Sequence, residues 1–460
     1  MQSVPPTHVL TKDTIGHVAH AKKMPVPQPE LQYNPQLKAE VTRFIASDVK
    51  TLRDIDVNSF RYMYDPPENK RDVLNARVWK VGGRIRAHYK LPEFSKLTEV
   101  SQDDRVYLGI VQSCGQVGSA VTCIVDGPWT PDVSYGANIQ LQMDDVASYS
   151  LYPGKIFAFK GKNVGAHTLD NGTNGTVLVS EVYDAPPLPL AAATHQRVKM
   201  EEDAAAPTRV VVMAGPYATD QARTIKQIED LVKFAYRSRH AAVVVLAGPF
   251  VSAPHDGAVD EAMMYDDQFD AITEKISQLA EEYHGLKVLV VPSLKDLAAD
   301  YVFPQPAFDV AFDSDNVLGL SNPTEVLVND DVTVAVCTND IIKHINGSSF
   351  VEVRPDPATG RLPRVAAEVV RSQSFYPLMP PAPDAQVDYA HHEAFEFAKS
   401  TPDILILPSY LPAFAKKVEG TLVINPGIVN KRNFAEVTIT PGAPNALVAD
   451  RATAEIFKLT

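Results

Sequence analysis

Two patterns of apolar and polar positions divide the chain into two parts. From about residue 75 to residue 183, short segments rich in β-branched and aromatic residues alternate with turns that contain glycine or asparagine, as is typical of β-strands. The predicted strands cover residues 75–86, 106–112, 120–126, 138–143, 155–160 and 176–183. Five or six strands within roughly 120 residues indicate a small closed barrel, such as an OB-fold.

The pattern changes beyond residue 207, where nearly continuous apolar segments alternate with amphipathic helices. The apolar segments begin at Val210, Val243 and Val288 and continue with residues 332–337, 403–407, 421–424 and 434–440. Helical spacing of apolar residues follows the first two, at Ile225, Ile228, Leu231, Val232 and Ala235 and at Phe269, Ile272, Ile276, Leu279 and Tyr283. Strands that are apolar on both faces belong to a sheet covered on both sides, so a layered α/β domain is predicted over residues 208–460.

The expectations for the other segments depend mainly on their content of proline and alanine. Residues 1–38 are rich in proline without a sustained apolar period, and we expect a flexible tail there. A helical lead-in is expected over residues 39–64, with a short helix near residues 37–49, before the barrel of residues 65–186. The Pro- and Ala-rich residues 187–207 are expected to form a linker that proteases cut readily.

Composition narrows the classes of function. A length of 460 residues predicts two or three domains. The 43 Lys and Arg residues stand against 56 Asp and Glu residues, and a formal net charge of -13 opposes non-specific attraction to nucleic-acid phosphates. The 3 cysteines lack the spacing of a metal site or of a disulfide framework, which fits a reducing compartment. Neither a signal peptide nor a membrane-spanning segment is predicted, so we expect a soluble intracellular protein.

The turns that follow the apolar segments are the candidate chemical site. In a binuclear metallophosphoesterase, such turns carry Asp, His and Asn ligands, because two divalent cations that share a phosphate need clustered carboxylates and imidazoles. This chain has Gly215 and Tyr217 in the first turn, Pro249 in the second, and Leu294 and Lys295 in the third. The sequence therefore predicts a hydrolase architecture that has lost its chemistry and works by binding.

Other polar residues offer weaker candidates. Ser409 and Leu411 stand where a Gly-His-x-His turn is expected, and Ser409 also lacks the flanking glycines of a nucleophile elbow. His344 is a candidate relic of the remaining His motif. His391 and His392 are adjacent, so on a helix they point about 100° apart and do not chelate one ion as an i, i+4 pair does. We interpret them as surface histidines.

An active phosphoesterase with unconventional ligands is the main enzymatic alternative. Its candidate ligands are Asp220, His255, which precedes Asp256, and Asp296. Against it, at least four expected ligand positions hold Gly, Pro, Leu or Lys. We therefore predict no catalytic, cofactor-binding or metal-ligating residue, no cofactor, and a protein that is not an enzyme.

A second alternative is a single-stranded nucleic-acid-binding protein of the OB type. Such proteins need exposed aromatic residues interleaved with basic ones along one face. The best cluster of this kind is Arg77, Trp79, Lys80, Arg84, Arg86, His88, Tyr89 and Lys90. Trp79 and Tyr89 equally fit a barrel core or a protein-docking surface, because OB-type barrels also dock proteins.

Short motifs with glycine and proline follow one another along the chain. They are Gly215-Pro-Tyr, Gly248-Pro-Phe, Val291-Pro-Ser-Leu-Lys-Asp296, Tyr301-Val-Phe-Pro-Gln-Pro306, Tyr376-Pro-Leu-Met-Pro-Pro381, Ile406-Leu-Pro-Ser409 and Ile424-Asn-Pro-Gly427. The barrel part adds Ser150-Leu-Tyr-Pro-Gly154 and Ala185-Pro-Pro-Leu-Pro189. Together, from about residue 60 onward, this ordered set resembles the family of B subunits of eukaryotic DNA polymerase alpha.

The resemblance implies an α/β plus all-β protein, in which an N-terminal OB-fold barrel is packed on an inactive calcineurin-like phosphoesterase domain. It implies a nuclear accessory subunit of the DNA polymerase alpha-primase complex that supports initiation of DNA replication and primer synthesis. The implied partners are the C-terminal zinc-containing domain of the catalytic polymerase subunit and the primase subunits, with only weak or indirect contact to DNA and none to membranes. Family members usually carry a small helical N-terminal domain before a long linker, which residues 1–38 do not match.

The nearest rivals are the small subunits of DNA polymerases delta and epsilon, which share the same inactive body. The segments that begin at Tyr301 and Tyr376 favour alpha. An archaeal relative retains a nuclease site, and the lost ligands argue against that assignment.

Overall fold

The structure is a computed structural model of two compact units. It describes residues 18–24, 47–53, 55, 61–117, 120–129, 138–165, 175–190, 206–218, 220–252, 264–442 and 446–459. We name Met1–Phe60, Pro189–Asp340 and Phe397–Thr460 the sandwich unit, and Arg61–Leu188 and Ile341–Glu396 the barrel unit. The predicted domain of residues 208–460 is therefore divided between the two units, and each unit is described by itself.

Two sheets and two long helices form the sandwich unit. Its strands are β1 (Val18–Met24), β2 (Val49–Thr51), β9 (Thr208–Ala214), β10 (Val243–Ala247), β11 (Lys287–Val291), β12 (Val317–Gly319), β13 (Thr324–Val328), β14 (Val332–Val336), β16 (Ile404–Ile406), β17 (Phe414–Val418), β18 (Thr421–Asn425), β19 (Asn433–Ile439) and β20 (Ala452–Leu459). Its helices are α4 (Gln221–Arg239), α5 (Tyr265–Glu282), α8 (Val448–Arg451) and the short η2 (Val429–Lys431). The strand orders are β1-β20-β19-β9-β10-β11-β12 and β17-β18-β16-β14-β13-β2.

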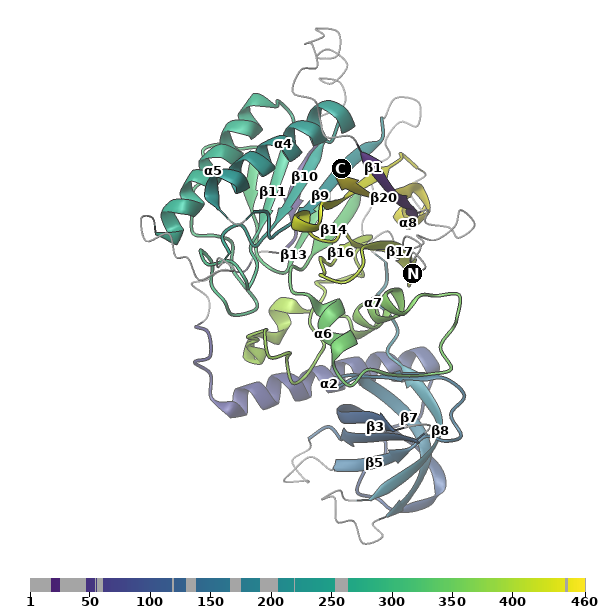
Figure 1. Ribbon diagram of the computed structural model, residues 1–460. Coiled ribbons are helices and arrows are strands. Elements are labelled where there is room, and N and C mark those ends of the chain that lie inside the picture. The colour runs from purple at the N-terminus through teal and green to yellow at the C-terminus, as the bar shows by residue number, and fades with distance from the viewer. Residues whose placement is uncertain are drawn as a thin grey trace, which may run out of the picture. The chain divides into compact units, whose positions relative to one another are not determined.

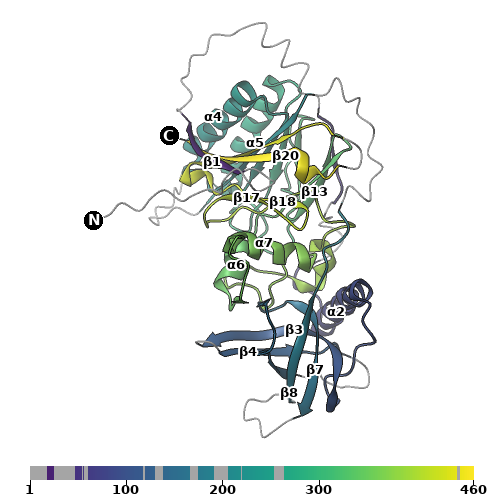
Figure 2. The same cartoon turned by 90° about the vertical axis from the view of Figure 1, so that its right-hand side faces the viewer.

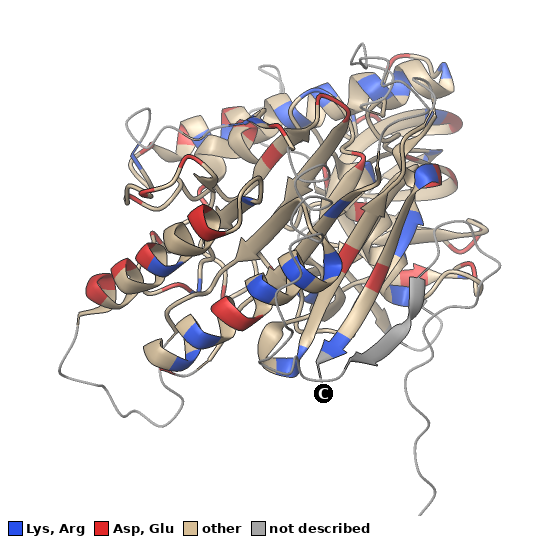
Figure 3. Cartoon of the chain, turned by 90° about the horizontal axis from the view of Figure 1, so that it is seen from above, with Lys and Arg blue, Asp and Glu red and all other residues tan. Residues whose placement is uncertain are grey.

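Apolar residues on both faces of the central strands hold these layers together. In β9, Val210 and Val212 belong to the core between the two sheets, whereas Val211 and Met213 pack with the residues of α4 and α5. This alternation follows the two-residue period of a strand. Figures 1 and 2 show α4 and α5 on the outer face of the larger sheet, and in Figure 3 charged residues mark the helices while the strands are mostly uncharged. The predicted layered α/β arrangement is confirmed for this unit.

Two strands lie where the sequence predicts something else. β1 pairs in parallel with β20, so the expectation of a flexible tail does not hold for Val18–Met24. β2 pairs antiparallel with β13, so Val49 starts a strand rather than ending the predicted helix. Main-chain hydrogen bonds at a sheet edge drive such pairing, and composition does not reveal them. The rest of that helix up to residue 46, and residues 191–205 of the predicted linker, lie outside the described residues.

A closed barrel is the centre of the barrel unit. Its strands are β3 (Ser101–Val117), β4 (Ala120–Asp126), β5 (Asn138–Gln142), β7 (Ile156–Gly165) and β8 (Thr176–Asp184), in the order β3-β4-β5-β8-β7. The other elements are α2 (Pro67–Tyr89), β6 (Tyr149–Leu151), α6 (Ile341–Gly347), β15 (Val351–Val353), α7 (Arg361–Ser372) and η1 (Tyr389–Phe395). Each barrel strand contributes to one buried core, through Tyr107, Cys123, Leu141, Phe157 and Val177. The predicted barrel and the five strands that close it are confirmed.

The predicted strand over residues 75–86 is wrong, because this segment is part of helix α2. Val78, Val81 and Ile85 recur with helical spacing and pack on the outside of the barrel, on a cluster that includes Leu108. Gly82 suggested a turn, yet in the helix a Cβ there would lie 2.3 Å from Leu108 Cδ2. The glycine therefore permits close packing of the helix on the barrel.

Residues 341–396 join the barrel unit through strand pairing and a shared core. β15 pairs antiparallel with β6, with Val351 opposite Leu151, and both residues belong to the barrel core. Cys114 Sγ lies 2.9 Å from the carbonyl oxygen of Ser349. The barrel core is therefore completed by residues that are distant in sequence.

Candidate functional site

The turns after β9 and β10 are packed too closely to hold metal-ligating side chains. A Cβ atom at Gly215 would lie 2.1 Å from the carbonyl oxygen of Pro249, and one at Gly248 would lie 2.5 Å from Asp296 Oδ2. The turns thus contact each other through their backbones. Gly215, an expected ligand position, therefore has no room for a side chain, and neither has Gly248, which precedes the expected ligand position Pro249.

Aromatic rings occupy the space beneath these turns. Tyr217, which stands at an expected ligand position, is buried and stacks on Phe250 with 5.4 Å between the ring centroids. Its hydroxyl donates a hydrogen bond of 3.1 Å to the carbonyl oxygen of Ala247. Burial raises the pKa of Tyr217 well above its usual value, so the phenol stays protonated as a donor. Tyr217 therefore has a structural role.

Asp296, a candidate unconventional ligand, holds the second turn instead. Its Oδ2 accepts a hydrogen bond of 2.9 Å from the backbone N–H of Phe250, and its Oδ1 accepts one of 3.0 Å from Val251. The residue is only 3% exposed, and burial raises the pKa of its carboxyl group to about 7 although both N–H donors oppose the shift. Both of its oxygens are thus committed to backbone donors.

The turns after β16 and β18 are joined by an amide side chain. Asn425 Oδ1 accepts hydrogen bonds from the backbone N–H groups of Ser409 and Gly427, each at 2.9 Å. Ser409 Oγ accepts a bond of 3.1 Å from Leu411 N, the pattern of a serine turn. This contact agrees with the prediction that Ser409 is a turn residue. The role of Asn425 was missed, although it begins the Asn-Pro-Gly part of a motif that the sequence reveals.

The other candidate ligands that the structure describes have partners of their own. Asp220 caps α4 by accepting a bond of 2.9 Å from Arg223 N. His344 belongs to the barrel unit, where its ring nitrogens lie 3.1 Å from the Tyr376 hydroxyl and 3.1 Å from Asp384. His255 and Asp256 lie outside the described residues. Across the described part of the chain, no group of three or more His, Cys, Asp or Glu side chains is placed to hold a metal ion.

The sequence suggests that His391 and His392 both lie on the surface, but in the structure His392 does not. His392 is 1% exposed, and its Nδ1 lies 3.5 Å from Glu396 Oε1. Burial and the nearby Arg77 guanidinium lower the pKa of His392 to about 4, so it is neutral at pH 7. It is therefore a core residue of the barrel unit.

Three of the eight residues in the predicted basic and aromatic cluster make polar contacts inside the barrel unit. Arg77 is buried beside Glu396, Lys80 donates to Glu396 at 2.5 Å, and Arg84 donates to Gln373. Trp79 is 42% exposed, which excludes the barrel core for this residue. Arg86, His88, Tyr89 and Lys90 are also exposed.

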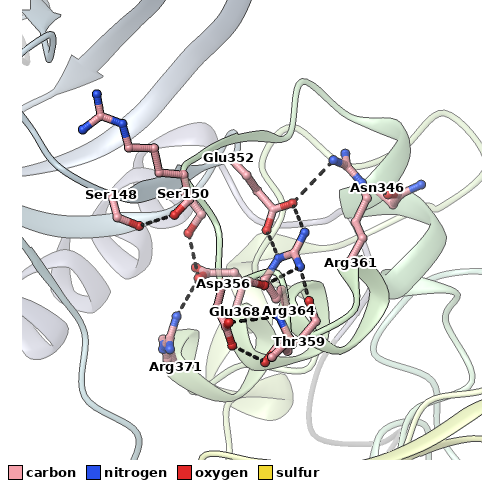
Figure 4. A network of polar contacts seen from close by, with 12 residues as sticks. Ser148, Ser150, Asn346, Glu352, Asp356, Thr359, Arg361, Arg364, Glu368 and Arg371 are labelled. Carbon is pink, nitrogen blue, oxygen red and sulfur yellow. Dashed lines mark hydrogen bonds and ion pairs between the residues drawn. The ribbon is translucent and has the colours of Figure 1, made fainter. Parts of the chain in front are cut away.

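A buried ionic network joins the barrel to α7. Lys155 is 4% exposed, and its ammonium lies 2.9 Å from both Asp184 and Glu368. Burial alone lowers the pKa of Lys155, but the two carboxylates outweigh this effect and raise the pKa above its usual value. Figure 4 shows Glu368 between Ser150 and Arg371, which donate to it at 2.8 and 3.0 Å. This network was not predicted, because its members are distant in sequence.

Two of the family-like motifs meet in the same unit. Gly154 has a φ of 95°, and a Cβ there would lie 2.4 Å from the carbonyl oxygen of Pro377. Met379 N donates a bond of 3.1 Å to the carbonyl oxygen of Pro153. Only glycine fits this conformation and this contact. The two motifs therefore contain residues that pack against each other although they are distant in sequence.

Comparison with known proteins connects these features to one family. Residues 210–416 match the family model described as the B subunit of DNA polymerase alpha/epsilon, and residues 71–183 match that described as the OB domain of the DNA polymerase alpha B subunit. The DNA polymerase alpha B subunit of Mus musculus is 28% identical over 381 residues, which cover 81% of this chain and 60% of that relative. The chain belongs to the family of DNA polymerase alpha B subunits. The family predicted from the motifs is thereby confirmed, and the closed barrel is its OB domain.

Other similar proteins carry the same name. The DNA polymerase alpha B subunit of Schizosaccharomyces pombe is 27% identical over 437 residues, or 89% of this chain and 73% of the relative. The chain spans about 60% of the length of the mouse and rat relatives. A solved OBody bound to hen egg-white lysozyme matches 20% of this chain and 94% of its own at 15% identity, with a TM-score of 0.15 that supports no argument.

None of the helices in the described residues is both long and apolar enough to cross a membrane.

Proposed function

We propose that this chain is a non-catalytic accessory subunit of the DNA polymerase alpha-primase complex. In this proposal, the sandwich unit and residues 341–396 derive from a calcineurin-like phosphoesterase fold without activity. The chain binds the C-terminal zinc-containing domain of the catalytic polymerase subunit and lies in one assembly with the primase subunits. It thereby supports initiation of replication and primer synthesis in the nucleus.

The closed packing of the strand-end turns carries this proposal. A binuclear hydrolase needs room for two cations and for the carboxylates that bridge them. Here the backbone of Gly215 contacts that of Pro249, and Asp296 binds two backbone N–H groups. Because protein atoms fill the place where a hydrolase would hold its metal ions, this large fold acts by binding other molecules at its surface. Stable protein interfaces of this kind bury about 1,600 Å² or more and are anchored by aromatic and Arg residues.

Two measurements test the proposal together. In a phosphodiesterase assay with manganese, using a chromogenic phosphodiester and DNA as substrates, the purified chain is expected to show only background turnover. Affinity purification of the tagged chain, followed by mass spectrometry, is expected to recover a polymerase catalytic subunit and primase subunits. Stoichiometric bound metal, with turnover that Asp296→Ala abolishes, would refute the non-catalytic role.

The single-strand-binding alternative has less support. Arg77, Lys80 and Arg84 contact Glu396 or Gln373 within the barrel unit. We therefore expect DNA binding by this chain to be weak and strongly dependent on salt.

A further inference from the structure

Exposed aromatic and basic residues lie along the outer face of helix α2. Trp79 is 42% exposed, and Arg86 and Lys90 are exposed as well. At about 100° per residue, position 86 lies within about 20° of position 79 around the helix axis, and Lys90 caps the end of the helix one turn later. We name Trp79, Arg86 and Lys90 the α2 stripe. The nearby Tyr89 is not part of it, because its ring packs on Tyr183 with 5.3 Å between the centroids.

The surface beside Trp79 is open. Gly83 follows Trp79 by one helical turn, and among the described residues a Cβ placed there would meet nothing within 4 Å. Ala76 and Ala87 lie on the same side of the helix and are exposed, so their short side chains leave this side uncovered. A planar group from outside the chain therefore has room to approach the indole ring.

The segment that carries the α2 stripe is basic although the chain is acidic. Residues 77–96 contain six Lys or Arg residues and one acidic residue, Glu93, whereas the whole chain has a formal net charge of -13. The Arg86 guanidinium lies 3.6 Å from Glu93, whose side chain is 87% exposed, and an ion pair this exposed contributes little. The Lys90 side chain forms no ion pair with any described residue. Both cations are therefore available to an anionic ligand.

The helix macrodipole explains only part of this arrangement. Basic residues near the C-terminal end of a helix stabilise that end, and Arg86 and Lys90 lie there. The dipole does not explain why Trp79, a large ring far from that end, is exposed. A stable protein partner needs an apolar contact made by several side chains, and the α2 stripe offers one ring beside two cations. A single strand of nucleic acid needs a ring for a base and cations for its phosphates.

We propose that the α2 stripe binds single-stranded nucleic acid, with one base stacked on Trp79 and phosphates at Arg86 and Lys90. From position 79 to position 90 the helix rises by about 16 Å, which about five nucleotides span at about 3.4 Å per phosphate. The stripe lies on a helix outside the barrel and so differs from the strand face with which OB-folds usually bind. Two cations and one ring make the binding weak and sensitive to salt. This inference goes beyond the accessory role, because the stripe forms without a polymerase subunit.

Quenching of tryptophan fluorescence tests the stacking of a base. The chain contains 2 tryptophans, so the variant Trp129→Phe leaves Trp79 as the only one. Phe keeps the backbone groups through which Trp129 binds the Asn75 side chain. Titration of this full-length variant with oligothymidylate at about 50 mM salt is expected to quench the fluorescence, whereas a duplex of the same length, whose bases are paired, quenches it much less. Saturating single strand without quenching overturns the proposal.

Fluorescence anisotropy with labelled oligothymidylate, from about 50 to 200 mM salt, tests the individual residues of the full chain. Trp79→Ala is expected to weaken binding about tenfold without changing the slope of log K against log salt. Arg86→Gln/Lys90→Gln is expected to reduce the magnitude of that slope by about 1.4.

Two controls match these variants, and thermal melting verifies that every variant is folded. Tyr301→Ala removes another exposed ring, and Arg223→Gln/Lys226→Gln removes two exposed cations of α4 that pair with Asp220 and Asp230. Both controls are expected to bind as the unsubstituted chain does. Stripe variants that bind like their controls overturn the proposal, and so does the absence of binding by the unsubstituted chain at the lowest salt.

Discussion

Replacing Asp296 by Asn should change how the stability of this protein depends on pH. Burial raises the pKa of Asp296 from 3.8 to about 7 in the folded state. Between these two values the folded chain holds a proton that the unfolded chain has lost. The stability of the folded state therefore falls as pH rises through this window, and Asn, which does not titrate, removes the fall.

The size of the effect follows from the shift. Each unit of pKa corresponds to about 1.4 kcal/mol, so the complete window is worth about 4 kcal/mol, and the interval from about pH 5 to about pH 8 is worth roughly 2–3 kcal/mol. The introduced asparagine keeps one acceptor oxygen for the two N–H groups of Phe250 and Val251. The variant thus has an additional destabilisation that is independent of pH.

The assay compares melting temperatures of the Asp296→Asn variant and the unsubstituted chain across this pH interval. The difference, variant minus unsubstituted chain, should become more positive as pH rises. Asp300→Asn is the matched control, because Asp300 is exposed only a few residues away. A difference for Asp296→Asn that is constant with pH, like that of the control, would show that burial does not control this carboxyl group.

Two further predictions concern the barrel unit. Lys155→Met leaves the partly buried Asp184 without this cation and the buried Glu368 with Arg371 alone, and should destabilise the protein by about 3–5 kcal/mol, whereas Lys160→Gln on the surface should leave the melting temperature nearly unchanged. Gly83→Ala should stabilise α2 by about 0.5–1 kcal/mol, since a Cβ there meets nothing within 4 Å. Gly82→Ala should destabilise it, because its Cβ would lie 2.3 Å from Leu108. Equal effects of the two members of either pair, measured by thermal melting, would contradict the packing described for them.

Periodic patterns made most of the fold predictable. The strands of the barrel and the central strands of the sandwich have a local pattern of apolar residues. In the structure they lie at the positions that this pattern predicts. Helix α2 was read as a strand because Gly82 and Gly83 resemble a turn. Its true signal was the helical spacing of Val78, Val81 and Ile85, which pack on the barrel. The edge strands β1 and β2 have no such signal, because their partners lie far along the chain.

The candidate site was predictable where it depends on residue identity. The absence of ligands at Gly215, Pro249 and Lys295 can be read directly from the turns. The contacts of Asp296 and the pairing of Lys155 with Glu368 depend on tertiary structure and leave no spacing in the sequence. For the same reason the sequence does not reveal that residues 341–396 complete the barrel unit.

The central claim, an accessory subunit without catalytic activity, is tested most directly by measuring binding to the C-terminal domain of a DNA polymerase alpha catalytic subunit. The purified chain and that domain are mixed and analysed by pull-down and gel filtration across ionic strength, beside a titration with single-stranded DNA. The account predicts a stoichiometric complex that persists at high salt, with DNA binding that is weak and lost as salt rises. Failure to bind any polymerase C-terminal domain, combined with sub-micromolar affinity for single-stranded DNA, would contradict it.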